Sequence, residues 1–167
     1  MHHQHVYRFA PTPAHRAERL FVFLHGAGAD AHSLIPAAFK FQARFPSAAL
    51  VLPEGVKRCE SDPTRQQWFS NRGLTDDNRM ARIEQILPDV EYLIRREQAT
   101  LKVPAERTVL IGFSQGGTVA LEAIKAKRVS GHGYSYGYAG YGLGLEVAKA
   151  AEDTRPHRAG EIYSQYA

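Results

Sequence analysis

A serine between two glycines is the part of this sequence whose residue types and spacing point most directly to chemistry. Gly112-Phe113-Ser114-Gln115-Gly116 fits the Gly-x-Ser-x-Gly pattern of a nucleophile elbow, where a strand runs into a helix through a very tight turn. The turn lifts the serine hydroxyl clear of the sheet, and the helix N-terminus favours negative charge developing nearby. Ser114 is therefore a candidate nucleophile. The alternative is a turn whose serine only caps the helix.

A loop of small residues, His25-Gly26-Ala27-Gly28, precedes the elbow in the chain and follows an apolar run. An oxyanion hole takes one backbone amide from the residue after the nucleophile and one from a loop after an earlier strand. Gln115 and Ala27 occupy those places, so their amides are candidate oxyanion donors. The loop 25–28 is not a dinucleotide-binding loop, because it lacks the third glycine of that motif. The elbow is not a phosphate-binding loop, because it has no Gly-Lys-Ser/Thr ending.

The elements that must position these groups alternate between strand and helix. Short apolar runs predict strands, and apolar residues at helical spacing predict helices. The expected strands are Val6–Phe9, Leu20–Leu24, Ala48–Leu52 and Thr108–Ile111, and the expected helices are 33–45, 79–98 and 115–127. Strands that are apolar on both faces and separated by helices predict an α/β fold on a mostly parallel sheet, here as a single domain over residues 1–167.

Several local features refine this expectation. Ser33 is a candidate cap for the first helix, with Pro36 in its first turn. Pro88 lies inside the second helical pattern, where its missing amide predicts a kink or a division into two helices. Residues 56–78 are polar and are expected to form a loop, interrupted by Trp68 and Phe69.

With these pieces in place, the sequence resembles the phospholipase/carboxylesterase family of α/β-hydrolases, which includes the acyl-protein thioesterases. The matching segments, within about residues 6–128, are 24–30, 67–70 and 111–117, and 74–79 resembles a bacterial esterase branch. The resemblance implies a serine hydrolase acting on small carboxylic or thio esters, with no cofactor and no metal. It also implies that Trp68 and Phe69 bind substrate near the acyl site, and anchoring of their loop on the core is the alternative.

The partners of the serine are not evident. The family carries an aspartate and then a histidine on loops after further strands, well downstream of the serine. Asp153 and His157 follow Ser114 in that order, but no expected strand precedes either of them. His132 and His25 are weaker candidates for the base, and His25 is expected to hold its loop. The alternative function is therefore a catalytically impaired α/β-hydrolase fragment that acts as a binding or oligomerising module.

The sequence after the third helix changes in character. Residues 131–144 mix glycine with tyrosine and contain no aliphatic strand core, and glycine at this density resists ordering. We expect residues 129–167 to be a polar tail, disordered apart from a short helix at 145–151, and the hydrolase sheet to be truncated after the nucleophile helix. The strand at Thr108–Ile111 should then expose an unpaired edge, which favours a homo-oligomer formed through it.

Composition excludes several classes of partner. The net charge is +4, but the basic residues are scattered and no recognition motif accompanies them, so nucleic-acid binding is not expected. No apolar run approaches the ~20 residues of a membrane-spanning helix or fits a signal peptide, which favours a cytoplasmic location. The single cysteine, Cys59, has no partner for an internal disulfide or for paired zinc ligation.

Overall fold

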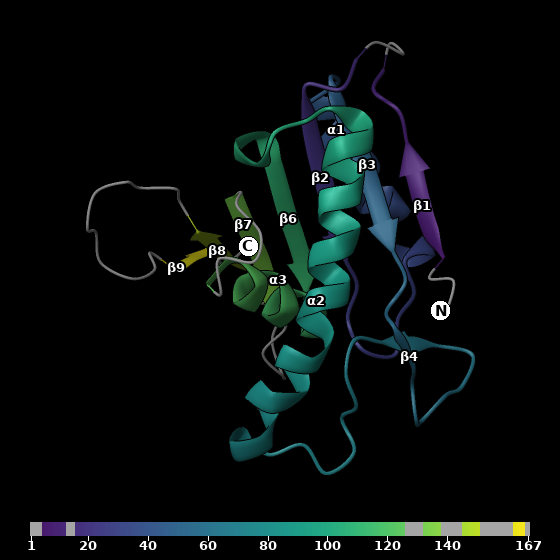
Figure 1. Ribbon diagram of the computed structural model, residues 1–167, viewed down its shortest axis with the longest axis vertical. Coiled ribbons are helices and arrows are strands. Elements are labelled where there is room, and N and C mark those ends of the chain that lie inside the picture. The colour runs from purple at the N-terminus through teal and green to yellow at the C-terminus, as the bar shows by residue number, and fades with distance from the viewer. Residues whose placement is uncertain (1–4, 13–15, 126–131, 138–144, 151–161, 166–167) are drawn as a thin grey trace.

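The computed structural model of the chain describes residues 5–12, 16–125, 132–137, 145–150 and 162–165. One sheet contains seven of the described strands, in the order β1-β3-β2-β6-β7-β8-β9 (Figure 1). These strands are β1 Val6–Phe9, β2 Arg19–Leu24, β3 Ala48–Pro53, β6 Thr108–Phe113, β7 His132–Gly137, β8 Leu145–Ala150 and β9 Ile162–Gln165. The four neighbours β3, β2, β6 and β7 are parallel, and β1, β8 and β9 join antiparallel. The expected α/β fold on a mostly parallel sheet is confirmed.

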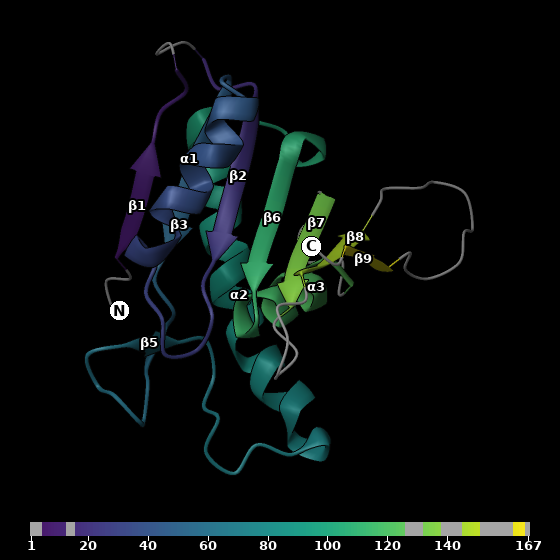
Figure 2. The ribbon, with the colours of Figure 1, turned by 180° about the vertical axis from the view of Figure 1, so that it is seen from behind.

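Helices cover both faces of this sheet. Helix α1 (Ile35–Arg44) lies on one face, and α2 (Asp76–Leu101) and α3 (Gln115–Lys125) lie on the other (Figures 1 and 2). Successive strand residues point to opposite faces, so β2 contributes to two cores. Leu20, Val22 and Leu24 pack in the core beneath α2 and α3, whereas Phe21 and Phe23 pack in the core beneath α1. These buried strands are what hold the elbow in place.

The long helix α2 differs from the expectation in its length and continuity. It begins at Asp76, where the Thr75 side chain accepts from the Asn78 amide and the Asn78 side chain accepts from the Thr75 amide. It then runs unbroken through Pro88, so the expected division into two helices is wrong, and the alternative, a kink at Pro88, stays a prediction. Buried apolar residues continue on both sides of Pro88, and their packing outweighs the one backbone hydrogen bond that proline removes.

The start of α1 also differs from the expectation. A 3₁₀ turn, η1 (His32–Leu34), precedes the helix, and α1 has no side-chain cap at its N-terminus. Ser33 is therefore not the helix cap. It instead closes a turn with Asp30, because its amide donates to the Asp30 carboxylate at 2.8 Å and its hydroxyl donates to the Asp30 carbonyl at 2.6 Å.

Strand β7 overturns the expectation for the Gly/Tyr stretch. It pairs parallel with β6, from Val109 opposite His132 to Phe113 opposite Tyr136. The outer edge of β6 is therefore paired, which removes the basis for a homo-oligomer through that edge. The expected end of the sheet after the nucleophile helix is wrong too, because β8 and β9 extend the sheet. The short helix expected at 145–151 is also wrong, since residues 145–150 form strand β8. A ladder needs only backbone donors and acceptors, which glycine provides, and tyrosine favours strands.

The polar stretch after β3 forms a small hairpin, with β4 (Lys57–Arg58) antiparallel to β5 (Gln66–Gln67). A bridge between Ala29 and Gln66 joins this hairpin to the loop after β2. Within the described ranges, no helix is both long and apolar enough to cross a membrane. The same ranges hold no cluster of three or more histidine, cysteine or acidic residues arranged to bind a metal ion.

Candidate active site

The turn between β6 and α3 has the geometry of a nucleophile elbow. Ser114 has φ +50°, in the left-handed region, and it is exposed while Gly112 and Gln115 beside it are buried. A Cβ at Gly112 would lie 2.3 Å from the Gly116 carbonyl oxygen, and one at Gly116 would lie 2.2 Å from the Leu24 carbonyl oxygen. Glycine is therefore required at both positions, as expected from the sequence.

The loop after β2 lies against the elbow. A Cβ built on Gly26 would be 3.4 Å from the Ser114 Cβ and 3.4 Å from the Phe113 carbonyl oxygen. The loop is fixed from its other side, since the Gly28 amide donates to the Gln66 carbonyl at 3.0 Å and the Gln66 amide donates to the Ala29 carbonyl at 3.2 Å. Among the described residues, no acceptor takes a hydrogen bond from the amides of Ala27 or Gln115. Binding of an oxyanion by these two amides remains a prediction.

His25 is fully buried and holds this loop in place. The Gly55 amide donates to its Nε2 at 2.8 Å, so Nδ1 must carry the ring proton, which it donates to the Gly26 carbonyl at 2.7 Å. With both ring nitrogens engaged, His25 has no lone pair to accept a proton from Ser114. The candidate role as base is wrong for His25, and its expected role in holding the loop is confirmed.

The other described histidines lie away from the elbow. His132 lies opposite Val109 on β6, whereas Tyr136 lies opposite Phe113, the residue before Ser114. His132 is four residues from Tyr136 along β7, which is ~13 Å at the usual rise of a strand. It is thus a poor position for the base. His5 and His32 both contact Tyr7 on β1, and β3 and β2 separate that strand from β6. Asp153 and His157 lie outside the described residues.

Trp68 and Phe69 are buried in the core between the sheet and α2 and α3, with 1% and 3% of their surface exposed. The Trp68 indole N–H donates to the His25 carbonyl at 2.8 Å, and the two rings lie 5.5 Å apart. These contacts support the loop-anchoring interpretation. Contact of either side chain with an acyl group remains a prediction.

The side chain of Gln115 makes the contacts that sequence reasoning missed. Its Oε1 accepts from the Trp68 amide at 2.7 Å, and its Nε2 donates to the Phe69 carbonyl at 2.8 Å and to Asn71 Oδ1 at 3.2 Å. The sequence signal for these contacts is a glutamine, with its long amide side chain, in a tight turn that is flanked by glycines. Such a side chain must be satisfied when the turn is buried.

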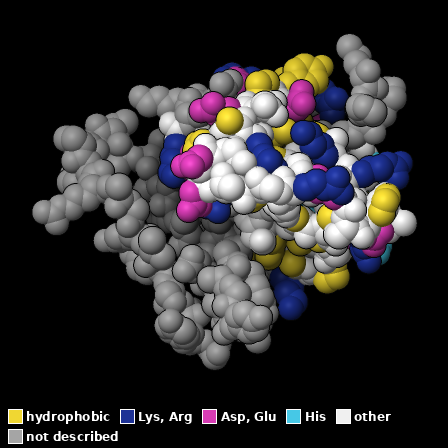
Figure 3. All heavy atoms as spheres, turned by 90° about the horizontal axis from the view of Figure 1, so that it is seen from below, with side chains coloured by type: hydrophobic (Ala, Val, Ile, Leu, Met, Phe, Trp, Pro, Cys, Tyr) yellow, Lys and Arg dark blue, Asp and Glu magenta, His cyan; other side chains and the backbone are white. Residues whose placement is uncertain are grey.

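Charges around this end of the molecule are mixed. Figure 3 shows lysine and arginine side chains interspersed with aspartate and glutamate on the face toward which the parallel strands run. Glu60, on the hairpin, has its pKa held below the ordinary value by hydrogen bonds from Ser70 and Gln67. The bond from Ser70 ties the hairpin to the segment that follows Trp68, and the bond from Gln67 lies within the hairpin.

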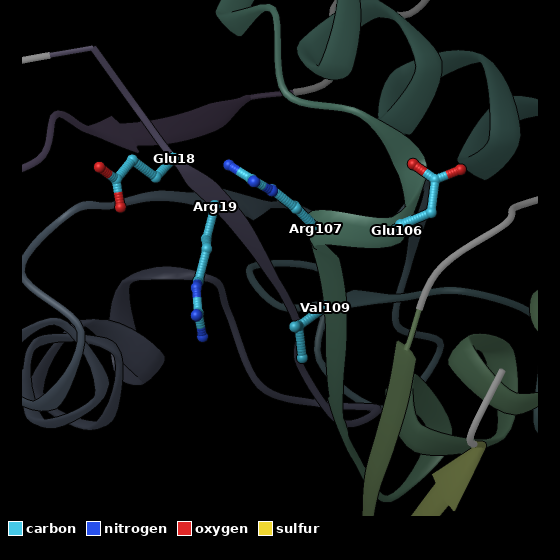
Figure 4. A pocket seen from close by; sticks show the side chains of 5 residues that line it. All are labelled: Glu18, Arg19, Glu106, Arg107 and Val109. Atoms are coloured by element: carbon cyan, nitrogen blue, oxygen red, sulfur yellow. The ribbon is translucent and has the colours of Figure 1, made fainter.

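A separate hollow of about 340 Å³ lies at the opposite end of the sheet. Figure 4 shows the side chains of Glu18 and Arg19, at the start of β2, across from those of Glu106, Arg107 and Val109, at the start of β6. Because parallel strands begin at that end, this hollow and Ser114 lie at opposite ends of β6.

The sequence of this chain is similar to those of known proteins. The model of the phospholipase/carboxylesterase family matches residues 7–134. Esterase YpfH of Escherichia coli is 37% identical over 127 residues, which are 76% of this chain and 53% of that protein. Acyl-protein thioesterase 1 of Cryptococcus neoformans is 30% identical over 131 residues, covering 72% of this chain and 53% of that protein. The chain thus spans about half the length of these curated relatives.

Solved structures show the same fold. Esterase PE8 superposes with a TM-score of 0.69 at 21% identity, covering 80% of this chain and 73% of that one. YahD, solved with malic acid, superposes with a TM-score of 0.66 at 17% identity, covering 85% of this chain and 68% of that one. The fold of the chain is that of an α/β-hydrolase.

Proposed function

The chain belongs to the phospholipase/carboxylesterase family, and we propose that it is a serine hydrolase of carboxylic or thio esters. The observation that carries the proposal is the placement of Ser114. It is exposed at positive φ at the end of a central parallel strand, with Gly26 of the preceding loop against its Cβ. The names of the two curated relatives, an esterase and an acyl-protein thioesterase, support this substrate class.

In the proposed reaction, the Ser114 hydroxyl oxygen attacks the acyl carbon and its proton passes to a base. The carbonyl oxygen becomes an oxyanion, which the amides of Ala27 and Gln115 bind. Each such donor typically lowers the barrier by about 3–4 kcal/mol. The intermediate collapses and expels the alcohol or thiol, which takes up the proton. Water then hydrolyses the acyl-enzyme by the same steps and restores Ser114.

The base in this scheme is a histidine oriented by a carboxylate. Asp153 and His157 follow Ser114 in the required chain order, and they lie outside the described residues. His25 is not assigned this role, because both of its ring nitrogens are hydrogen-bonded.

A second candidate function, a catalytically impaired fragment that binds ligands or partners, is favoured by one observation. No histidine among the described residues lies in position to accept the Ser114 proton. A serine elbow without its base keeps the oxyanion donors and typically a residual ~10³–10⁴-fold rate enhancement over water.

Hydrolysis of p-nitrophenyl esters and matching thioesters separates the two candidates. The leading proposal predicts turnover that Ser114→Ala abolishes, with a rate that rises through an inflection at about pH 6–7 as a histidine loses its proton. A slow rate with no such inflection would assign the chain to the impaired class. Hydrolysis by Ser114→Ala at the parent rate would show that the serine assignment is wrong.

A further inference from the structure

The side chain of Gln115 connects the elbow to the segment 68–71, which we name the tryptophan segment. We propose that this side chain is a positioning group: it fixes the tryptophan segment against the elbow and thereby keeps the Gln115 backbone amide aimed at the oxyanion. The inference rests on the proposed function, in which that amide is one of the two oxyanion donors.

The hydrogen-bond pattern permits only one orientation of the Gln115 amide. The backbone N–H of Trp68 donates to Oε1 at 2.7 Å. Two acceptors, the Phe69 carbonyl and Asn71 Oδ1, lie 2.8 and 3.2 Å from Nε2. Rotating the amide by 180° would bring a donor onto the Trp68 donor and an acceptor onto both acceptors. Both polar atoms of the buried Gln115 side chain therefore have their partners in the tryptophan segment. The residue directly before Gln115 in the chain is the exposed Ser114.

The tryptophan segment continues into a turn that α2 holds separately. The Arg82 guanidinium donates to the carbonyls of Ser70 at 2.7 Å, Arg72 at 2.8 Å and Gly73 at 3.3 Å. Asn78 Nδ2 donates to the Gly73 carbonyl at 2.9 Å. The chain from Trp68 to Gly73 is thus fastened to α2 at its far end and to the first residue of α3 at its near end. Gln115 joins this connection to the elbow itself, and the Trp68 indole separately anchors the segment on the His25 carbonyl of the neighbouring loop.

The link matters because an oxyanion donor acts only when it is aimed before the reaction begins. Gln115 is the first residue of α3, where the backbone has just left the left-handed conformation of Ser114. Its amide has no partner in the described part of the chain to hold its direction, whereas its side chain has three. A misplacement of ~1 Å can cost a reaction about 100-fold. Anchoring through the side chain prevents such drift.

The chain offers a matched control for testing this. Gln42 of α1 is another buried glutamine, also 7% exposed, and its Nε2 donates to the carbonyls of Ala10 at 2.7 Å and Ala48 at 3.1 Å. Ala48 begins β3, at the end of the sheet away from Ser114. Gln115→Met and Gln42→Met therefore each remove a buried amide at similar volume, and the backbone N–H remains in both.

Two measurements on the intact chain decide the inference. The first is the rate at which a fluorophosphonate labels Ser114, and the second is acrylamide quenching of Trp68, the single tryptophan. We expect Gln115→Met to label at least about tenfold more slowly and to be quenched more, while Gln42→Met matches the parent in both. Equal labelling rates and equal quenching in the two variants would overturn the inference. If the parent itself is not labelled, the proposed function fails, and quenching alone decides whether Gln115 fixes the tryptophan segment.

The variant Gln115→Glu gives a readout that a purely steric role would not produce. An ionised carboxylate can still accept from the Trp68 amide but repels the Phe69 carbonyl and Asn71 Oδ1, whereas a protonated one donates to them. The labelling rate of Gln115→Glu relative to the parent should therefore rise as the pH falls and the carboxylate takes up a proton. A ratio that stays constant between pH 8 and pH 5 would contradict positioning through these hydrogen bonds.

Discussion

At the residue scale, the site depends on a serine held in an unfavourable backbone conformation. A residue with a Cβ typically loses about 1–2 kcal/mol in the left-handed region that Ser114 occupies at φ +50°. Such conformations persist where surrounding structure enforces them, and they gather at functional sites. Ser114 lies between Gly112 and Gly116, whose backbones pack so closely that a Cβ at either position would lie 2.2–2.3 Å from a carbonyl oxygen.

The strain at Ser114 can be measured by replacing it with glycine. Ser114→Gly should raise the free energy of unfolding by up to about 1 kcal/mol, because glycine adopts positive φ without penalty, and it should abolish labelling. Lys102, at φ 54° after the end of α2, is the control. Lys102→Gly should stabilise the chain similarly and keep labelling unchanged. A Ser114→Gly protein that is less stable than the parent in urea denaturation would contradict strain at the elbow.

At the scale of elements, the elbow works because β6, α3 and the end of β2 approach one another without intervening side chains. A Cβ at Gly112 would meet the backbone of Gly116 and Gly117 at 2.3–2.4 Å, which no side-chain rotation can relieve. Gly28, in the loop after β2, differs: it has φ +74°, and a Cβ there would meet nothing within 4 Å.

This contrast predicts very different costs for the same substitution. Gly112→Ala should lower the free energy of unfolding by about 3 kcal/mol or more, because the elbow must open to admit the methyl group. Gly28→Ala should cost only about 1 kcal/mol, from backbone strain alone. Chemical denaturation of the two variants beside the parent measures both values. Similar losses would mean that the contacts around Gly112 do not set the geometry of the elbow.

The central strands and the helix after the elbow could be predicted from the sequence nearly to their ends. Continuous apolar runs such as 20–24 are diagnostic because the strands are covered on both faces. Strand β7 could not be predicted in this way. Its pairing with β6 is a backbone interaction between distant segments, and glycine-rich composition argued against it.

The candidate site also contains features that could be predicted from the sequence and features that could not. Ser114, Ala27 and the steric need for Gly112 and Gly116 follow from short motifs whose geometry is local. The role of Gln115's side chain does not, because its partners are 44 to 47 residues away in sequence and lie in a polar loop without periodicity. The hydrogen bond that occupies Nε2 of His25 likewise depends on Gly55, which is 30 residues away.

At the scale of the whole molecule, an ion pair joins the edge strand β1 to the long helix α2. Arg8 donates to both carboxylate oxygens of Glu97, at 3.0 and 2.6 Å, and Arg96 donates to one of them at 3.2 Å. Glu97 is only 3% exposed. Its burial alone would raise its pKa, but the hydrogen bonds and charges of Arg8 and Arg96 outweigh burial, so the pKa of Glu97 is lowered.

This pair predicts a pH-dependent stability. Since the folded-state pKa of Glu97 lies below its unfolded value, its contribution is present above about pH 4.3 and disappears as the pH falls through the folded pKa. Glu97→Gln should lower the free energy of unfolding by about 1–3 kcal/mol at pH 7, and this difference should shrink toward pH 3. Urea denaturation of both proteins from pH 7 to pH 3 tests this.

The control is Glu91→Gln, which removes an ion pair with Arg95, four residues along the same helix. Both side chains of this pair are more exposed than those of the Arg8–Glu97 pair. Exposed pairs of this kind contribute little, so its effect should stay below about 0.5 kcal/mol at every pH. A loss in Glu97→Gln that is no larger than this, or that grows on acidification, would contradict the role assigned to the Arg8–Glu97 pair.

The central claim, that Ser114 is an activated nucleophile, is tested most directly by covalent labelling. The intact chain is treated with a fluorophosphonate, digested and analysed by peptide mass spectrometry, with Ser114→Ala treated in parallel. The account predicts one phosphonyl adduct, on the peptide containing Ser114, and none on the variant. An unmodified Ser114, or an adduct that persists on the Ser114→Ala chain, would contradict it.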